Sequence, residues 1–379
     1  MLDFISYLLN GLSLGCIYAL IAVGYTMVYG IIKLINFAHG EFYMFGAYAG
    51  YFTLVLLFGG SASGRDLSFF ALLCAILIAG VSTGILAVIV ERLVYRPLRK
   101  SGRIVALLAA LGVSLLMQNG AQQAFGAKTR PYAHTFTSQR LPRTVIQPNS
   151  LVPGTTADRD VSIVFCVPKD GGKLTLVENI VQRGNVFDEP ERKRLNEIVA
   201  QAAKDECEAT VYSYPAVTVT TKDGLILGVL GLVTLALFLL VQHTRFGRAM
   251  RAVSHDFDAA ALMGIDVDRV ITWTFFIGAF VAGIGGTLGG GMYYNSISPL
   301  MGLMLGLKAF VSAVIGGIGS IPGALAGALL LGVSEAMVSS MIPHGYGSLY
   351  SDALTFAILI FVLLVRPSGL LGKPASDKL

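Results

Sequence analysis

The chain is poor in charged residues. Only 13% of its 379 residues are Asp, Glu, Lys or Arg, whereas a soluble domain typically carries about 25%. Hydrophobic residues make up 54% of the sequence. A protein surface that faces water needs more charge than this, so the composition excludes an ordinary soluble protein and indicates a chain that lies in lipid.

The sequence also lacks the residue patterns of an enzyme. His39, His243, His255 and His344 do not cluster as metal ligands, and no serine–histidine–acid arrangement is visible. No Gly-x-x-x-x-Gly-Lys-Ser/Thr phosphate-binding loop occurs, since the stretch 369–373 has the wrong spacing. We therefore predict that the chain is not an enzyme and that it binds no metal or cofactor itself.

Long apolar runs dominate what is present. A membrane-spanning helix needs about 20 mostly apolar residues, and backbone polar groups left unpaired in hydrocarbon cost several kcal/mol, so such runs must be helices. We predict an all-α membrane protein, a polytopic bundle of eight or nine spans, because one run can be re-entrant or split. The runs are 4–29, 35–58, 69–90, 104–125, 225–241, 270–292, 300–318, 322–342 and 353–365.

The positions of Lys and Arg predict the orientation of these spans. Short cytoplasmic loops are rich in basic residues, and the loop 91–103 holds Arg92, Arg96, Arg99, Lys100 and Arg103 against one acid. Counting spans from this loop places 126–222 outside, 242–269 inside and the C-terminus inside. The chain then divides into 1–125 with helices one to four, the insert 126–222, and 223–379 with helices five to nine.

The insert 126–222 is polar, with 13 of the 28 Lys and Arg residues. Its β-branched stretches 161–167 and 209–220 favour strands, and 189–206 has helical spacing, so we expect a small extracytoplasmic α+β unit. Cys166 and Cys207 each lie beside a predicted strand. In an oxidising compartment they are a candidate disulfide, and the alternative is two buried free thiols.

Glycines recur four residues apart within several runs. Small residues at this spacing allow helix backbones to approach closely in lipid. We read them mainly as packing positions. The pairs are Gly11 and Gly15, Gly46 and Gly50, Gly80 and Gly84, Gly286 and Gly290, Gly302 and Gly306, and Gly323 and Gly327.

A few polar residues interrupt the apolar runs. Ionisable groups are costly in the bilayer and usually face the bundle interior. Asn36, His39, Gly40 and Glu41 follow the first run, where Asn36 can cap a helix and Gly40 can loosen it. Two interpretations are open: this group lines a solute path, or it is a polar helix entrance near the headgroups. Farther along the chain, we expect Lys308 to pair with Glu335 first and Glu41 second, and to stabilise the structure rather than contact a solute.

The cytoplasmic loop 243–269 contains a short helix with readable ends. Asp256 can cap its N-terminus, Asp258 lies in its first turn, and Gly264 can take the left-handed conformation that ends it. Ala259, Leu262 and Met263 form an apolar face between basic flanks. Such a helix either docks into a groove on a soluble partner or lies on the membrane surface.

Four stretches carry a resemblance to one known family. The loop 247–265, which includes Gly247, Arg248, Arg251 and Ala260, resembles the coupling loop of the permeases of branched-chain amino acid ABC importers, with Asp258-Ala259-Ala260 in place of Glu-Ala-Ala. The stretch 25–41, the segments 306–310 and 316–323, and the ending 366–372 are similar to the same family, in the same order. The resemblance covers nearly the whole chain outside the insert, where the family usually has a much shorter loop.

The resemblance implies a multi-pass subunit of the bacterial inner membrane that works by alternating access. Its implied partners are a second homologous permease subunit, two ATP-binding cassette ATPase subunits and an extracytoplasmic solute-binding protein, with no role for nucleic acid. ATP would be used by the partner subunits only. The alternatives are a urea or short-amide permease of the same family, and a secondary transporter that needs no ATPase.

Overall fold

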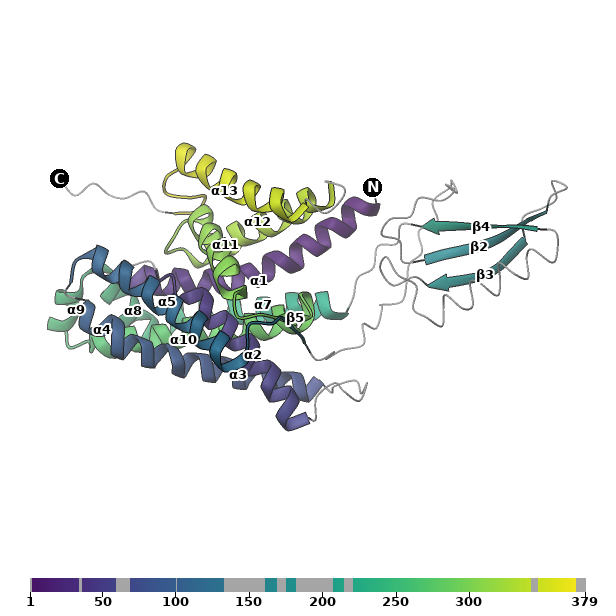
Figure 1. Cartoon of the computed structure of the whole chain (residues 1–379). Coiled ribbons are helices and arrows are strands. Elements are labelled where there is room, and N and C mark those ends of the chain that lie inside the picture. The colour runs from purple at the N-terminus through teal and green to yellow at the C-terminus, as the bar shows by residue number, and fades with distance from the viewer. Residues whose placement is uncertain are drawn as a thin grey trace. The chain divides into compact units, whose positions relative to one another are not determined.

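The computed structural model is mostly helical (Figure 1). It describes residues 2–33, 36–58, 69–99, 101–132, 161–168, 175–181, 207–214, 221–341 and 347–372. The chain separates into two compact units. The larger comprises Leu8–Gln139 and Thr220–Leu379, and the smaller comprises Met1–Tyr7 and Arg140–Val219.

Each of the nine predicted apolar runs overlaps one long helix of the described chain. These helices are α1 (Leu2–Ile32), α2 (His39–Phe58), α3 (Phe69–Val90), α5 (Arg103–Phe125), α7 (Thr221–His243), α10 (Val267–Leu288), α11 (Met301–Gly316), α12 (Ile321–Met341) and α13 (Gly347–Val365). Shorter helical elements are α4 (Arg96–Leu98), α8 (Arg245–His255) and α9 (Phe257–Leu262), with π-helical turns η2 (Glu91–Tyr95) and η3 (Gly289–Tyr293).

Six helices of the described chain are long and apolar enough to cross a membrane: Tyr7–Ile32, Phe70–Leu98, Ile104–Phe125, Asp223–His243, Val267–Tyr293 and Ile321–Ser339. Met301–Gly316 and Tyr350–Val365 are apolar but shorter. The α2 helix has 20 residues but begins with His39 and Glu41. A polytopic membrane protein is therefore confirmed, whereas the count of eight or nine spans stays a prediction.

The α1 and α10 helices form the centre of the larger unit. The apolar window of α1 is 83% buried, against 22% for α7 at the periphery. Close contacts at glycine hold the bundle together: a Cβ atom on Gly46 of α2 would lie 2.4 Å from the Cα of Gly283 on α10, and one on Gly15 of α1 would lie 2.8 Å from the Cα of Leu329 on α12. The predicted role of these glycines in helix packing is confirmed.

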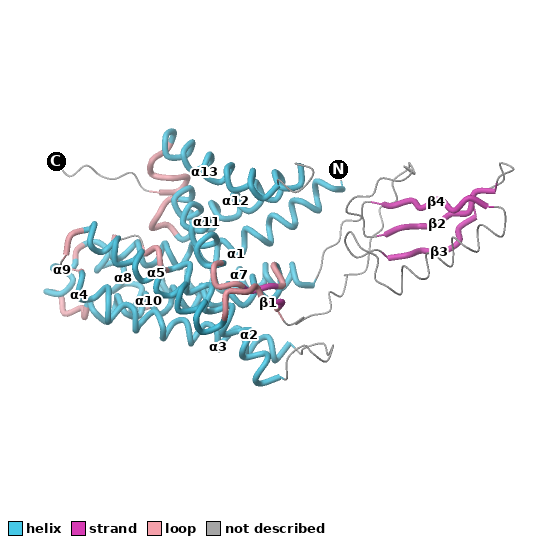
Figure 2. The backbone as a smooth tube through the Cα atoms, in the orientation of Figure 1, coloured by secondary structure: helices cyan, strands magenta, loops and turns pink. Residues whose placement is uncertain are grey.

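The smaller unit contains an antiparallel sheet in the order β3-β2-β4 (Figure 2). Its strands are β2 (Val161–Pro168), β3 (Thr175–Val181) and β4 (Cys207–Tyr214). The first and last were predicted approximately, β3 was not predicted, and the helix expected at 189–206 lies outside the described residues. Backbone register pairs Cys166 with Ala209 and Cys207 with Pro168, so the two cysteines occupy adjacent strands and their disulfide stays a prediction.

Candidate functional site

The short helices α8 and α9, between α7 and α10, form an elbow at one end of the larger unit. Figure 1 shows α4, α8 and α9 together at this end. The chain turns after α7, where Thr244 caps α8. The Thr244 side chain accepts a hydrogen bond of 3.0 Å from the amide of Gly247. A Cβ atom on Gly247 would lie 2.2 Å from the carbonyl oxygen of Val241. Only glycine therefore lets α8 fold back so closely on the end of α7.

The α8 helix presents one apolar and one basic face. Gly247, Met250 and Val253 are buried, while Arg248 and Arg251 are exposed. The Arg251 guanidinium donates a hydrogen bond to the carbonyl oxygen of Val241. A cation at the carbonyl end of a helix is favourable because it meets unpaired acceptors and the negative end of the helix dipole. Arg251 therefore fastens α8 to the end of α7.

The α9 helix has the ends that the sequence predicts. The Asp256 carboxylate accepts hydrogen bonds from the amides of Asp258 and Ala259 at 2.9 and 3.0 Å. Gly264 has a φ angle of +82°, and the amides of Gly264 and Ile265 donate to the carbonyls of Ala261 and Ala260 at 3.0 and 3.1 Å. This pair of bonds is a Schellman motif. Both caps are confirmed, and they fix the orientation of a helix of only six residues.

The exposed side of α9 is apolar. Leu262 is 88% exposed and Met263 is 82% exposed, and Phe257 and Ala259 are also exposed, whereas Ala260 is buried against the unit. Large apolar side chains left almost fully exposed on a capped, oriented helix are an interaction surface. This surface fits both predicted roles, docking into a groove on another protein and lying on the membrane surface.

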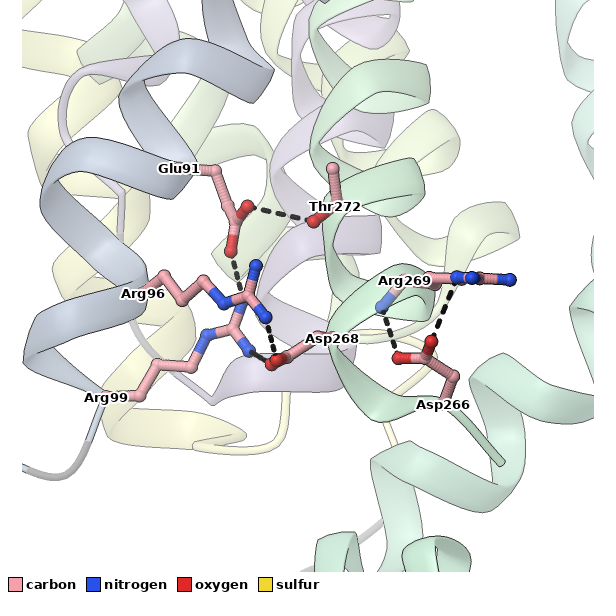
Figure 3. Close-up of polar contacts among 7 residues, drawn as sticks. All are labelled: Glu91, Arg96, Arg99, Asp266, Asp268, Arg269 and Thr272. Atoms are coloured by element: carbon pink, nitrogen blue, oxygen red, sulfur yellow. Dashed lines mark hydrogen bonds and ion pairs between the residues drawn. The ribbon is translucent and has the colours of Figure 1, made fainter. Parts of the chain in front are cut away.

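An ion-pair network connects the neighbouring loop to the base of α10 (Figure 3). The Glu91 side chain is fully buried and pairs with Arg99, and it accepts a hydrogen bond of 2.9 Å from the Thr272 hydroxyl. Arg99 also pairs with Asp268 at 2.6 Å, and Arg96 pairs with the same carboxylate. The network locks η2 and α4 to α10, directly beside the elbow. The sequence predicts only the orientation of the spans from these arginines, because Asp268, which both of them contact, lies far away in the chain.

The glycine-rich turn after α11 meets the C-terminal segment. The amides of Leu370 and Leu371 donate to the carbonyls of Ile315 and Gly316 at 2.8 and 2.9 Å. Gly317 and Gly369 both have positive φ angles and their backbones lie in contact. Two motifs that the sequence places 50 residues apart are therefore one structural feature, which ties the tail to the turn between α11 and α12.

Lys308 of α11 lies in a polar cluster between helices. Its ammonium group pairs with the Glu335 carboxylate of α12, as predicted, and with Asp352 of α13 at 2.7 Å. Glu335 also accepts hydrogen bonds from the Tyr18 hydroxyl of α1 at 2.8 Å and from Ser351 at 3.1 Å. The cluster connects four helices. Asp352 was not predicted as a partner because it immediately precedes the apolar run that begins at 353.

Glu41 does not pair with Lys308 in this structure. It is fully buried on α2, where its Oε1 accepts hydrogen bonds from Ser114 and Gln118 of α5 at 2.9 and 2.7 Å. Within the described residues, its Oε2 has no hydrogen-bond partner, and it faces the backbone of α11: a Cβ atom on Gly302 would lie 2.6 Å from this oxygen. One carboxylate oxygen is thus covered only by a close helix contact.

Asn36 lies in the turn between α1 and α2, and His39 is the first residue of α2. The Asn36 Oδ1 accepts hydrogen bonds from the Ala38 amide at 3.1 Å and from the Tyr95 hydroxyl of η2 at 2.6 Å. Asn36 thus closes a turn directly ahead of α2, and its role as the cap of that helix stays a prediction. The His39 ring is buried with its centroid 4.6 Å from that of Tyr25. A Cβ atom on Gly40 would lie 2.3 Å from the carbonyl oxygen of Gly302, so Gly40 is a helix contact.

A short strand pair follows α5 and η3. In it, β1 (Arg130–Pro131) pairs with β5 (Ser296–Ile297). Tyr132 then packs its ring on the η3 glycines, 2.9 Å from where a Cβ atom of Gly291 would lie. Burial raises the pKa of the Tyr132 phenol above its ordinary value. This contact could not be predicted, since it joins residues more than 150 positions apart.

Comparison with known proteins finds one family along the chain. The family described as "Branched-chain amino acid transport system / permease component" matches residues 7–363. The high-affinity branched-chain amino acid transport system permease protein LivH of Escherichia coli (strain K12) is 36% identical over 377 residues, covering 100% of this chain and 98% of LivH. The corresponding permease protein BraD of Pseudomonas aeruginosa is 35% identical over 375 residues, covering 99% of this chain and 98% of BraD. No solved structure matches the chain.

Proposed function

From the premise that the chain belongs to the permease components of branched-chain amino acid transport systems, we propose that it forms one half of the membrane path of an importer for branched-chain amino acids. The family places it among the permeases of ABC importers, which work with ATPase and solute-binding components. In our proposal two ATPase subunits bind and hydrolyse ATP, a second homologous permease completes the path, and this chain binds no cofactor.

The geometry of α9 is the observation that carries the ATPase contact. The caps at Asp256 and Gly264 hold the helix rigid, and Leu262 and Met263 project almost fully exposed from it. A rigid helix with an apolar face transmits force to whatever it is attached to, here α8 and the base of α10. We propose that closure of the ATPase pair moves α9, and that α10 carries this motion into the bundle as a rigid-body shift.

The experiment is a double substitution on the exposed face of α9. Leu262→Asp with Met263→Asp replaces two exposed side chains, so the permease itself keeps its stability within about 0.5 kcal/mol. We expect uptake by proteoliposomes that contain the complete transporter to fall at least about tenfold, because loss of apolar burial on this scale costs more than 1.4 kcal/mol of binding. Leu371→Asp, another exposed leucine of the described chain, is the matched control. Wild-type uptake by the double variant would refute the proposal.

The orientation proposed for the chain places the elbow and the C-terminus in the cytoplasm. In support, the end of the unit that carries α4, α8 and α9 is rich in arginine, as cytoplasmic loops are. The C-terminal end of α5 and the N-terminal end of α7 then lead to the insert 126–222 on the extracytoplasmic side. In this proposal the chain has eight or nine spans. There the insert lies on the face that receives the solute-binding protein.

The solute path is proposed to run beside α2 and α11. Glu41 and His39 are buried polar groups beside the close backbone contact of Gly40 with Gly302 and Gly306. The Glu41 carboxylate and the Met44 side chain also lie against Gly302. A small movement of α11 would then expose Glu41 to a solute, while Lys308 and Glu335 hold the other face of α11 in place.

A further inference from the structure

Three aromatic residues form a ladder on one face of α10. Trp273, Phe276 and Phe280 recur at intervals of three and four residues. The ring centroids of Trp273 and Phe276 are 5.4 Å apart, and those of Phe276 and Phe280 are 6.2 Å apart. The rings of Phe276 and Phe280 lie on Gly84 and Gly80 of α3, where an added Cβ atom would approach them within 2.7 and 2.8 Å. Both phenylalanines are only partly buried. They therefore form an apolar strip along the seam between α3 and α10.

The ladder ends at a groove lined by arginine. Arg92, Arg96 and Arg269 line this groove, together with Asp268 and Trp273, and its volume is about 480 Å³. Trp273 is 54% exposed and borders both the groove and the ladder. Tryptophan favours the level of the lipid headgroups, where one edge of its ring is apolar and the other is wet.

The groove and the network behind it carry excess positive charge. Asp268 is shared between Arg96 and Arg99 (Figure 3), and Arg269 pairs with Asp266 at 2.9 Å while its side chain stays 82% exposed. Arg92 is exposed and makes no ion pair with the described part of the chain. Four arginines thus face three carboxylates: Arg92, Arg96, Arg99 and Arg269 against Glu91, Asp266 and Asp268.

We propose that this groove and ladder bind one anionic phospholipid. The phosphate lies at Arg92 and Arg269, the glycerol region at Trp273, and an acyl chain along Phe276 and Phe280. A headgroup with one net negative charge complements the single unmatched positive charge. A free anion would contact only the arginines, whereas a phospholipid would place its phosphate at the arginines and its acyl chain on the adjoining aromatic rings. The bound lipid bridges α3 and α10 at the base of the elbow.

The first test measures lipid binding to the full-length chain in detergent by native mass spectrometry. We expect phosphatidylglycerol to bind more tightly than phosphatidylcholine. Arg92→Gln should weaken phosphatidylglycerol binding about fivefold, the factor for roughly 1 kcal/mol per basic residue near an anionic lipid, and it breaks no ion pair of the described structure. Arg366→Gln, at an exposed arginine outside the groove, should leave the binding unchanged.

The second test uses the fact that the chain has a single tryptophan. In nanodiscs, brominated phosphatidylglycerol should quench Trp273 fluorescence more strongly than brominated phosphatidylcholine, and Arg92→Gln should remove this difference. Equal quenching by the two lipids, or no quenching because a protein partner covers Trp273, would overturn the proposal. Millimolar inorganic phosphate should leave the lipid bound, and its displacement would instead assign the groove to a free anion. Neither test depends on the ATPase contact or on transport.

Discussion

Replacing Lys308 by methionine is the most informative perturbation of the bundle. The ammonium group pairs with Glu335 and Asp352, and the Lys308 and Glu335 side chains are only 14% and 11% exposed. Methionine has a similar length but no charge. The Lys308→Met variant therefore leaves the Glu335 carboxylate buried without its cation.

The expected cost follows from what remains around Glu335. Removing one partner of a buried ion pair costs about 3–5 kcal/mol. Tyr18 and Ser351 still donate hydrogen bonds to the carboxylate, and Asp352, whose side chain is 47% exposed, can be solvated. We therefore expect a loss of about 2–3 kcal/mol in the free energy of unfolding. Lys308→Met combined with Glu335→Gln removes both charges and should recover about 2 kcal/mol of it.

The assay is a double-mutant cycle on the purified chain, unfolded by sodium dodecyl sulfate in mixed micelles. The two single variants, the double variant and the wild type give the coupling energy directly. Asp352→Asn is a useful comparison because it removes only the more exposed carboxylate, and its cost should be smaller. A coupling energy below about 0.5 kcal/mol, the range of independent sites, would refute the structural role of the pair.

Three further results are expected. Asp256→Ala removes the cap of α9 and should cost about 1 kcal/mol of local stability, which faster hydrogen exchange at the Asp258 and Ala259 amides and reduced uptake would show. Asp256→Asn should restore both the exchange rate and the uptake. Unchanged exchange in Asp256→Ala would contradict the cap. Gly40→Val should lower the melting temperature because its Cβ atom would lie 2.3 Å from the carbonyl oxygen of Gly302 on α11. Gly112→Ala, with open space around it, should leave the melting temperature unchanged. Equal effects of the two substitutions would argue against the close contact. Glu91→Ala leaves Arg99 with only the shared Asp268 carboxylate and should cost about 2 kcal/mol in unfolding free energy, so an unchanged value would count against the network.

Local features of the fold were predictable from the sequence. The apolar runs gave the helices, because backbone groups in lipid have no other way to pair. The ends of α9 were predictable because caps depend on residues within one or two turns, such as Asp256 and Gly264. Lys308 and Glu335 could be paired because few ionisable groups lie within the apolar runs.

Contacts between distant segments were not predictable. The Glu91 network needs Asp268 and Thr272, which lie more than 170 residues farther along the chain, and nothing in loop 91–103 identifies them. Tyr132 on η3 and the tail on the α11–α12 turn are similar cases. Glu41 was a possible partner of Lys308 by charge alone, but the packing of α2 against α5 gives it Ser114 and Gln118 instead.

Cross-linking from α9 tests the central claim most directly. Met263→Cys, introduced after the native cysteines are replaced, places a thiol at a position of the elbow that is 82% exposed. In inside-out vesicles that contain the complete transporter, we expect this thiol to react with a membrane-impermeant reagent when the ATPase subunits are stripped, and to cross-link to an ATPase subunit when they are present. Labelling only in right-side-out vesicles, or no cross-link at any stage of ATP turnover, would contradict the account.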